Sequence, residues 1–221
     1  MQRAAPSAEP AVPSTPAQHG RRDRILETAT VILNAGGEDA LQMKELAQRA
    51  DVSLATLYRY FPAKDHVLLA ITLSRYEQAL ARVRAEPARP GSMRERVTVH
   101  LLREFRAGQR EPLLTAALSH AVTETSRTFS SAIEQIEGTH LQVIRHVAAA
   151  GERLGPWPEA VLPVVADVFN AATRRWLAGM SSPARTRAEI RLGGRLLDLP
   201  EEVLDEEPGP AAPDPTEPAP G

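Results

Sequence analysis

The sequence predicts an all-α protein in which a small three-helix unit precedes a larger helical bundle. Two observations carry this prediction. Between residues 21 and 199 the apolar side chains recur with helical spacing, and no segment alternates with the period of two that strands show. Proline and glycine interrupt this pattern at intervals of helical length, which indicates where the helices begin and end.

The two ends of the chain differ in composition. Residues 1–20 are rich in alanine and proline, and residues 200–221 combine proline with seven carboxylates and no basic residue. Such segments bury too little apolar surface to fold, so both are predicted to be disordered tails. The formal charge of the whole chain is −2. The part between the tails is therefore net positive.

Three helices are predicted before residue 61. The first spans about 21–34, with Ile25, Ala29 and Ile32 on one face and the pair Gly36–Gly37 at its end. Two short helices follow at about 43–50 and 54–60, joined by a turn at 51–53. Helices this short are unstable alone, so they need each other.

Six further helices are predicted. The first runs from about 63 to 85, after which Pro87 and Pro90 break the chain. Several of the others begin at a proline or end before a glycine, and they span about 92–109, 112–123, 126–150, 158–180 and 183–197.

Residues 43–61, MKELAQRADVSLATLYRYF, have the pattern of a helix-turn-helix. Ser53 is placed to cap the second short helix by accepting a hydrogen bond from a free backbone N–H of its first turn. Ala47 is small where the two helix axes approach most closely. An ideal helical wheel turns one apolar set inward: Leu46, Ala47, Val52, Leu54, Leu57 and Phe61.

The outer face of the second short helix has the chemistry of a DNA reader. Ala55 permits close approach, Thr56 can meet base edges, and Arg59 can reach guanine or phosphate. Tyr58 and Tyr60 flank this face, where their hydroxyls could bond phosphate oxygens. Alternatively, the two tyrosines mark a protein interface.

Polar residues nearby extend the predicted surface for double-stranded DNA. Lys64 opens the next helix, where its charge and the free N–H groups can hold a phosphate. Gln42 and Lys44 could hold a phosphate in the same way at the start of the helix at 43–50, and Gln42 could also pair with adenine. The N-terminal tail either solubilises the protein or, with the arginines just inside it, touches DNA. The candidate DNA-binding residues are Gln42, Lys44, Ser53, Ala55, Thr56, Tyr58, Arg59, Tyr60 and Lys64.

These residues resemble the TetR family of bacterial regulators, whose pattern appears here as Ala47, Val52–Ser53, the run TLYRYF at 56–61, and Lys64. The family commonly has glycine where this chain has Ala55. The resemblance implies a DNA-binding domain at 21–66 and a helical effector-binding and dimerisation domain at 67–199. It also implies a homodimer with one reader helix in each of two successive major grooves of a near-palindromic operator.

The family likeness further implies a ligand cavity and a dimer interface built from the last two long helices. About half of the apolar residues on these helices are expected in the subunit core and the rest in the dimer seam: Val161, Leu162, Val164, Val165, Val168, Phe169, Ala172, Trp176, Ile190, Leu192, Leu196, Leu197 and Leu199. Candidate cavity residues are His100, Arg103, His120, Thr123, His140, Phe169, Asn170, Thr173 and Arg174. A lone histidine on such a helix is more often a core or surface residue than a ligand contact.

A narrower resemblance, to actinobacterial regulators of steroid catabolism, is carried by Gln42–Met43, residues 49–52, 56–62 and the run PLLT at 112–115. It implies a small hydrophobic effector, such as a bulky lipid or steroid acid or its coenzyme A thioester. The long helix at 63–85 would link cavity to reader. A ligand changes DNA affinity only through its different affinities for the two states.

Other functional classes are excluded or remain alternatives. The absence of cysteine excludes disulfides and Cys-based zinc sites, and the histidines lack metal-ligand spacing, so no metal or cofactor is expected. No catalytic motif is present, which leaves an enzyme or acyl-binding module as a minor alternative. Without a membrane span or signal sequence, the protein is expected in the cytoplasm, at the nucleoid when bound to DNA. The main hypothesis is a ligand-released repressor, and an activator of the same fold is the alternative.

Overall fold

The structure is a computed structural model that describes residues 13–125 and 128–199, and over these ranges it contains helices and no strand. This confirms the predicted all-α class. The C-terminal tail and the first twelve residues of the N-terminal tail lie outside the described residues. Within the described ranges, no helix combines the length and apolar character needed to cross a membrane.

The first helix, α1 (Pro16–Ala40), begins earlier than predicted. The side chain of Thr15 caps it by accepting a hydrogen bond from the backbone N–H of Gln18, and Pro16 occupies its first turn, where the missing N–H costs nothing. The prediction of a disordered tail is therefore wrong for residues 16–20. At Gly37 the backbone leaves the helical region (φ 69°, ψ −164°), so the predicted end at Gly36–Gly37 appears as a break before a last turn.

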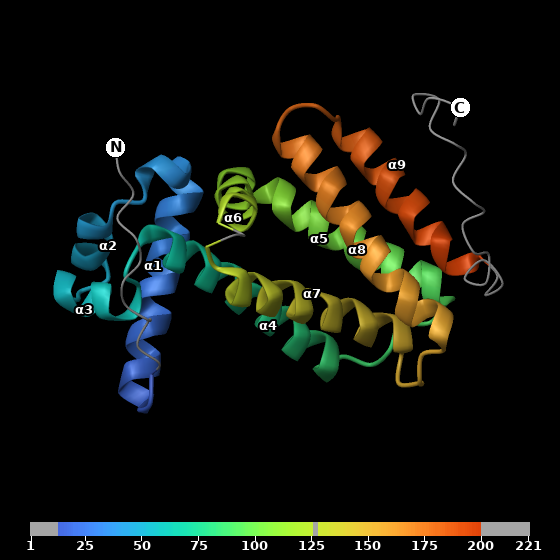
Figure 1. The fold of residues 1–221 in the computed structure, drawn as a ribbon, viewed down its shortest axis with the longest axis horizontal. Coiled ribbons are helices and arrows are strands. Elements are labelled where there is room, and N and C mark those ends of the chain that lie inside the picture. The colour runs from blue at the N-terminus through green and yellow to red at the C-terminus, as the bar shows by residue number, and fades with distance from the viewer. Residues whose placement is uncertain (1–12, 126–127, 200–221) are drawn as a thin grey trace, which may run out of the picture.

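Helices α2 (Met43–Arg49) and α3 (Leu54–Tyr60) lie within one residue of their predicted limits. Together with the long α1 they form the group of helices on the left of Figure 1, which we call the reader. Arg24 on α1 donates a hydrogen bond from Nε to the carbonyl oxygen of Ala50 at 2.9 Å. This bond fixes the turn between α2 and α3 to the body of α1.

Six further helices complete the fold and match the predicted order. They are α4 (Lys64–Ala85), α5 (Met93–Arg110), α6 (Pro112–Glu124), α7 (Ser130–Ala149), α8 (Pro156–Leu177) and α9 (Pro183–Gly194), and a short 3₁₀ turn, Arg195–Asp198, follows α9. α8 begins at Pro156 rather than at the predicted 158, because either proline is tolerated in a first helical turn. α7 begins four residues later than predicted.

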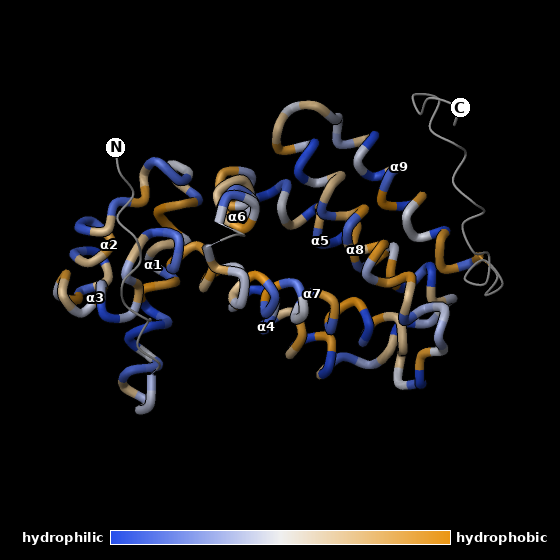
Figure 2. The backbone as a smooth tube through the Cα atoms, viewed as in Figure 1, coloured by the Kyte–Doolittle hydropathy of each residue, from blue (hydrophilic) through white to orange (hydrophobic). Residues whose placement is uncertain are grey.

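Two hydrophobic clusters hold these helices together. The first runs from Ile25 to Ile136 and joins the reader to α4, α6 and the start of α7. The second joins α5, the end of α7, α8 and α9. Helices α4 and α7 pack side by side (Figure 1). In Figure 2 the first turns of α1, which project beyond α2 and α3, are mostly hydrophilic. The predicted domain limit at residue 66 lies within the first cluster, so the reader is packed directly against the helices that surround the cavities described below.

Candidate nucleic-acid interface and ligand cavities

The N-terminus of α3 is fixed by a side-chain cap. The backbone N–H of Thr56 donates to Ser53 Oγ at 3.1 Å, and the Ser53 hydroxyl donates to Thr56 Oγ1 at 2.8 Å. The predicted cap is therefore confirmed. It also holds the Thr56 side chain in one orientation while its methyl group remains available for contact. Ala55, Tyr58 and Arg59 are exposed, and Thr56 is half-buried.

Two residues of α3 exchange the places that the helical wheel predicted. Tyr60 is only 3% exposed and belongs to the core, whereas Leu54 is 40% exposed. At about 100° per residue, both side chains lie about 60° from the buried Leu57, on opposite sides. The wheel therefore cannot distinguish them, and tertiary packing decides. Leu57, Tyr60 and Phe61 face inward, and Leu54 joins the outer face.

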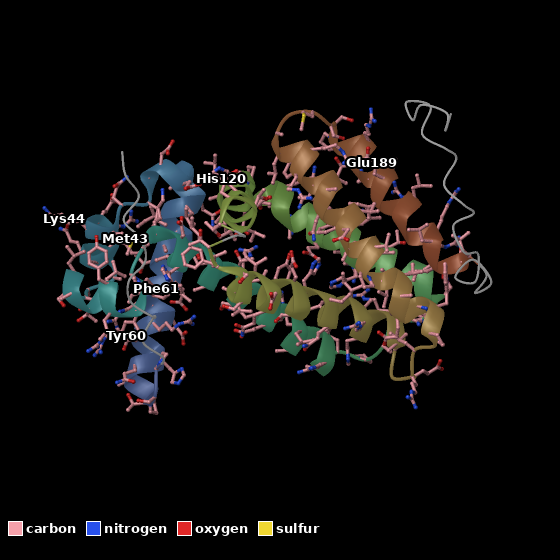
Figure 3. All side chains as sticks on the ribbon, in the orientation of Figure 1. Met43, Lys44, Tyr60, Phe61, His120 and Glu189 are labelled. Atoms are coloured by element: carbon pink, nitrogen blue, oxygen red, sulfur yellow. The ribbon has the colours of Figure 1, made fainter. Side chains whose placement is uncertain are left out.

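The hydroxyl of Tyr60 is buried and has no hydrogen-bond partner in the described structure. Figure 3 shows Tyr60 together with Met43 and Phe61 within the reader. A phosphate oxygen cannot reach this hydroxyl unless the reader repacks. The prediction that Tyr60 flanks the DNA-facing surface is therefore wrong for this conformation, and Tyr58, which is 44% exposed, remains in a position to contact a phosphate.

Replacing Tyr60 by phenylalanine should leave operator affinity unchanged and should keep or raise the free energy of unfolding by about 1 kcal/mol, because the change removes a buried, unpaired hydroxyl. Urea denaturation and electrophoretic mobility shifts measure the two quantities. Tyr58→Phe is the matched control, since it removes an exposed hydroxyl and should weaken DNA binding. An equal loss of DNA affinity in both variants would contradict the assignment of Tyr60 to the core.

The polar residues predicted to extend the DNA-binding surface differ in their surroundings. Lys44 and Gln42 are exposed at the start of α2, and Figure 3 shows Lys44 on the outer side of the reader. Lys64 instead pairs with Glu38, with Nζ at 3.2 Å from Oε1 and 3.3 Å from the carbonyl oxygen. A phosphate at the start of α4 would have to share Lys64 with Glu38, and this contact remains a prediction.

His120 lies at the junction of α6 and α1 rather than in a cavity (Figure 3). Its Nδ1 is 2.9 Å from Glu38 Oε2, and its side chain is 57% exposed. Glu38 therefore contacts both Lys64 of α4 and His120 of α6. The prediction of His120 as a cavity residue is wrong, because α6 turns this part of its surface toward α1 and not toward the bundle interior.

A cavity of about 210 Å³, which we call the effector cavity, lies among helices α4 to α8. Six predicted residues line it: Thr123, His140, Phe169, Asn170, Thr173 and Arg174. Phe105, Leu118, Val122 and Ile136 supply further apolar surface. The hydroxyl of Thr173 is buried and has no partner in the described structure, so a ligand entering here would find an available hydrogen-bonding group.

One wall of the effector cavity contains an ionisable cluster that the sequence reasoning missed in part. His140 Nε2 lies 3.3 Å from Glu104 Oε2, and the rings of His140 and Tyr76 stack with centroids 4.5 Å apart. Burial raises the pKa of Tyr76, and the hydrogen-bonded carboxylate of Glu104 raises it further, so Tyr76 stays a neutral donor. The sequence signal was a glutamate placed beside Phe105 on the apolar side of α5.

The pKa of Glu104 is the balance of opposing effects. Burial raises this pKa, but the facing His140, the more distant His100 and the Tyr76 hydrogen bond together bring it below its ordinary value. Glu104 is therefore held as a carboxylate, which accepts hydrogen bonds from both neighbouring rings.

A second cavity, of about 230 Å³, lies at the far end of α4. His100 and Arg103 line this cavity and not the effector cavity, so the prediction that groups them with Asn170 and Thr173 is wrong. The physical reason is that His100 lies in the N-terminal half of α5, which packs against the end of α7, and that Arg103 points about 100° around the helix from its neighbour Glu104. The effector cavity meets the later part of α5, at Glu104 to Gly108.

The fold and the exposed face of α3, after its capped turn, define a helix-turn-helix DNA-binding regulator. The model of bacterial regulatory proteins of the tetR family matches residues 25–71. The repressor KstR of Rhodococcus jostii strain RHA1 is 34% identical over 186 residues, which is 83% of this chain and 85% of the relative. The chain belongs to the tetR family of bacterial regulatory proteins.

Solved structures share the whole helical arrangement. A TetR transcriptional regulator from Rhodococcus sp. RHA1 has a TM-score of 0.73 and 24% identity, over 82% of this chain and 97% of that one. FadR of Thermus thermophilus, a TetR-family repressor in complex with lauroyl-CoA, has a TM-score of 0.63 and 22% identity, over 86% of this chain and all of that one. At these identities the likeness establishes the fold.

Proposed function

We propose that this protein is a transcriptional repressor that binds a near-palindromic operator as a homodimer and is released by a hydrophobic acid or its coenzyme A thioester. The observation that carries the proposal is the exposed face of α3, which the Ser53 cap holds in place. The hydrophobic cluster beneath it continues into α4, α6 and α7, which line the effector cavity. A relative that spans most of the chain, KstR of Rhodococcus jostii, is named as a transcriptional repressor. Such a regulator acts at the nucleoid in the cytoplasm.

The DNA contacts in this proposal are of two kinds, contacts to base edges and contacts to phosphates. Ala55, Thr56 and Arg59 face base edges in the major groove, where Thr56 offers a methyl group and a hydroxyl, and Arg59 can donate to guanine. Tyr58 and Lys44 contact phosphates and fix the register of the helix. Gln42 stands beside Lys44, although its amide nitrogen also donates to the carbonyl oxygen of Asp39 at 2.9 Å.

Replacing Thr56 by valine should change the base preference at one position of each operator half-site, at a cost of about 1 to 3 kcal/mol for the preferred sequence. Valine keeps the shape and loses the hydroxyl. The measurement is a mobility shift with the chain's own upstream region and single-base variants of the bound site. Lys44→Ala should weaken all sequences equally, and Gln142→Ala, on the exposed side of α7, should change nothing. A uniform loss for Thr56→Val would remove Thr56 from the base readers.

The dimer in this proposal forms through α8 and α9. Five of the apolar residues that the sequence divides between core and seam are buried within the subunit and belong to the core: Val161, Leu162, Val165, Phe169 and Ala172. Val164 and Leu192 are instead 48% and 64% exposed, and they lie on two helices that pack side by side. A second copy related by a two-fold axis would cover both.

The effector in this proposal enters the cavity lined by Phe105, Leu118 and Phe169 with its apolar part and meets Thr173 or Arg174 with its polar end. The volume of about 210 Å³ is below the roughly 300–1,000 Å³ of typical ligand pockets. A bulky effector would therefore have to separate α4 from α7. Because α4 shares the reader's core, this separation would move the two readers of a dimer away from operator spacing.

Adding lauroyl-CoA to the complex of protein and operator should release the DNA, whereas coenzyme A alone, which lacks the apolar chain, should release little. The fold holds lauroyl-CoA in FadR of Thermus thermophilus. A preformed complex that survives every hydrophobic acid and thioester would contradict the effector class and leave DNA binding intact. Deleting the gene should raise expression from the operator, and lower expression would favour the activator.

A further inference from the structure

Most of the charged residues that line the second cavity, which we call the cationic cavity, are basic. Its walls come from the end of α4, the connecting segment 86–91, α5 and the end of α7. A single carboxylate, Glu86, faces three arginines and two histidines: Arg89, Arg96, Arg103, His100 and His146. Apolar side chains, such as Val83 and Val147, complete the walls and reduce the water that can screen these charges.

Arg96 is fixed in place without neutralising its charge. Its guanidinium donates to the carbonyl oxygens of Ala148 at 2.6 Å, Gly91 at 2.5 Å and Val147 at 3.2 Å. Two of these carbonyls end α7, so capping that helix explains the position of Arg96. No carboxylate pairs with it in the described part of the chain, and its charge remains available to the cavity.

Arg89 and Arg103 have no such structural role. Within residues 13–125 and 128–199, neither makes an ion pair or a side-chain hydrogen bond, although both line the cavity. Their charges act on a common neighbour. The pKa of His100 is lowered first by burial, while Glu104 opposes the change, and His140, Arg103 and Arg89 lower it further. Both arginines therefore contribute positive potential at His100, which lines the cationic cavity.

We propose that the cationic cavity is a binding site for a phosphate-bearing anion, distinct from the effector cavity. Arg89 comes from the segment after α4 and Arg103 from α5, so an anion bound by both would bridge the far end of α4 to α5, on the side opposite the reader (Figure 1). Arginine guanidinium groups bind phosphate oxygens with paired, charge-assisted hydrogen bonds.

The two cavities share a wall, which allows two sources for the phosphate. His100 of the cationic cavity has its Nε2 4.0 Å from Oε2 of Glu104, which lines the effector cavity. The anion is then either a free phosphate compound or the phosphate-bearing part of an effector whose apolar part occupies the neighbouring cavity. The shared chemistry is the phosphate, and binding experiments with the separate parts distinguish the sources.

The test is calorimetric titration at low salt with pyrophosphate, coenzyme A, lauroyl-CoA and laurate. The wild type is compared with the double variant Arg89→Gln, Arg103→Gln and with Arg106→Gln, an exposed residue of α5 that lines neither cavity. The removed arginines are exposed and unpaired in the described structure, so the thermal unfolding of the double variant should match the wild type. Binding of phosphate-bearing probes should weaken roughly tenfold or more in the double variant alone.

Pyrophosphate binding that weakens in this way supports the site with a free anion as its ligand. Binding of coenzyme A or lauroyl-CoA that weakens, with pyrophosphate inactive and laurate unaffected, supports the site with the effector's own phosphates as its ligand. Equal affinities in the wild type and the double variant overturn the proposal, as does the failure of every phosphate-bearing probe to bind. Operator binding is not a readout, so failure here is distinguishable from failure of the proposed repressor function.

Discussion

Replacing Leu192 by aspartate should convert the proposed dimer to a monomer and lower operator affinity by about a hundredfold or more. Leu192 is 64% exposed on α9, and Val164 is 48% exposed on the adjacent α8. In a two-fold interface the substitution occurs twice, so two carboxylates would lose water without gaining a partner, at a cost of several kcal/mol. A monomer places only one reader on DNA and loses the contacts of the second half-site.

Sedimentation velocity and mobility shifts measure the two parts of this prediction. Val31→Asp is the control for oligomeric state, because Val31 is 57% exposed on α1, which does not pack against α8 or α9. This variant should remain a dimer. A Leu192→Asp protein that sediments as a dimer at micromolar concentration would place the subunit interface elsewhere on the molecule.

The fold was predictable because the residues that begin and end helices act locally. Ser53 caps α3 and Pro112 opens α6, so both helices begin where the sequence predicts. The early start of α1 carries the same kind of signal, Thr15 before Pro16. The alanine- and proline-rich composition of the first twenty residues obscured that signal, because composition describes a whole segment and a cap concerns only one turn.

The sites were less predictable, because they depend on which helix faces each surface. A helical wheel gives the direction of Tyr60 relative to Leu57, but burial depends on packing against α1 and α2. Similarly, His100 and Glu104 lie one turn apart on α5 yet line different cavities. The sequence indicated His140 as a candidate, but its partner Glu104 lies 36 residues away, and only the fold brings them together.

The same long-range placement decides which apolar residues of α8 lie in the subunit core. The apolar surface of α8 covers more than one face, and the sequence predicts a division between subunit core and dimer seam without assigning each residue. In the structure Val161, Leu162 and Val165 are buried in the second hydrophobic cluster, which leaves Val164 on the remaining side. Helix α9 then places Leu192 beside α8 on the outer surface.

Replacing Glu104 by glutamine should lower the free energy of unfolding by about 2 kcal/mol at pH 7, because charge-assisted hydrogen bonds to Tyr76 and His140 become neutral ones. Since the pKa of Glu104 is lowered in the folded protein, the carboxylate contributes stability above its unfolded value of 4.5 and loses it as the pH falls through the folded pKa. The difference between wild type and variant should therefore shrink in acid. Urea denaturation from pH 7 to pH 3 measures it.

His100 adds a separate test of charge in this cluster, in a higher pH range. Its folded pKa is also lowered, chiefly by burial, so the unfolded chain takes up a proton more readily as the pH falls through 6.5. The wild type should lose stability in this higher range before the Glu104 step begins. In Glu104→Gln the first step should persist and grow, since the carboxylate no longer favours the protonated ring, while the second step should disappear. Glu137→Gln, at an exposed carboxylate of the same cavity, should show both steps unchanged. A Glu104→Gln profile parallel to the wild type at every pH would mean that Glu104 contributes by packing and not by charge.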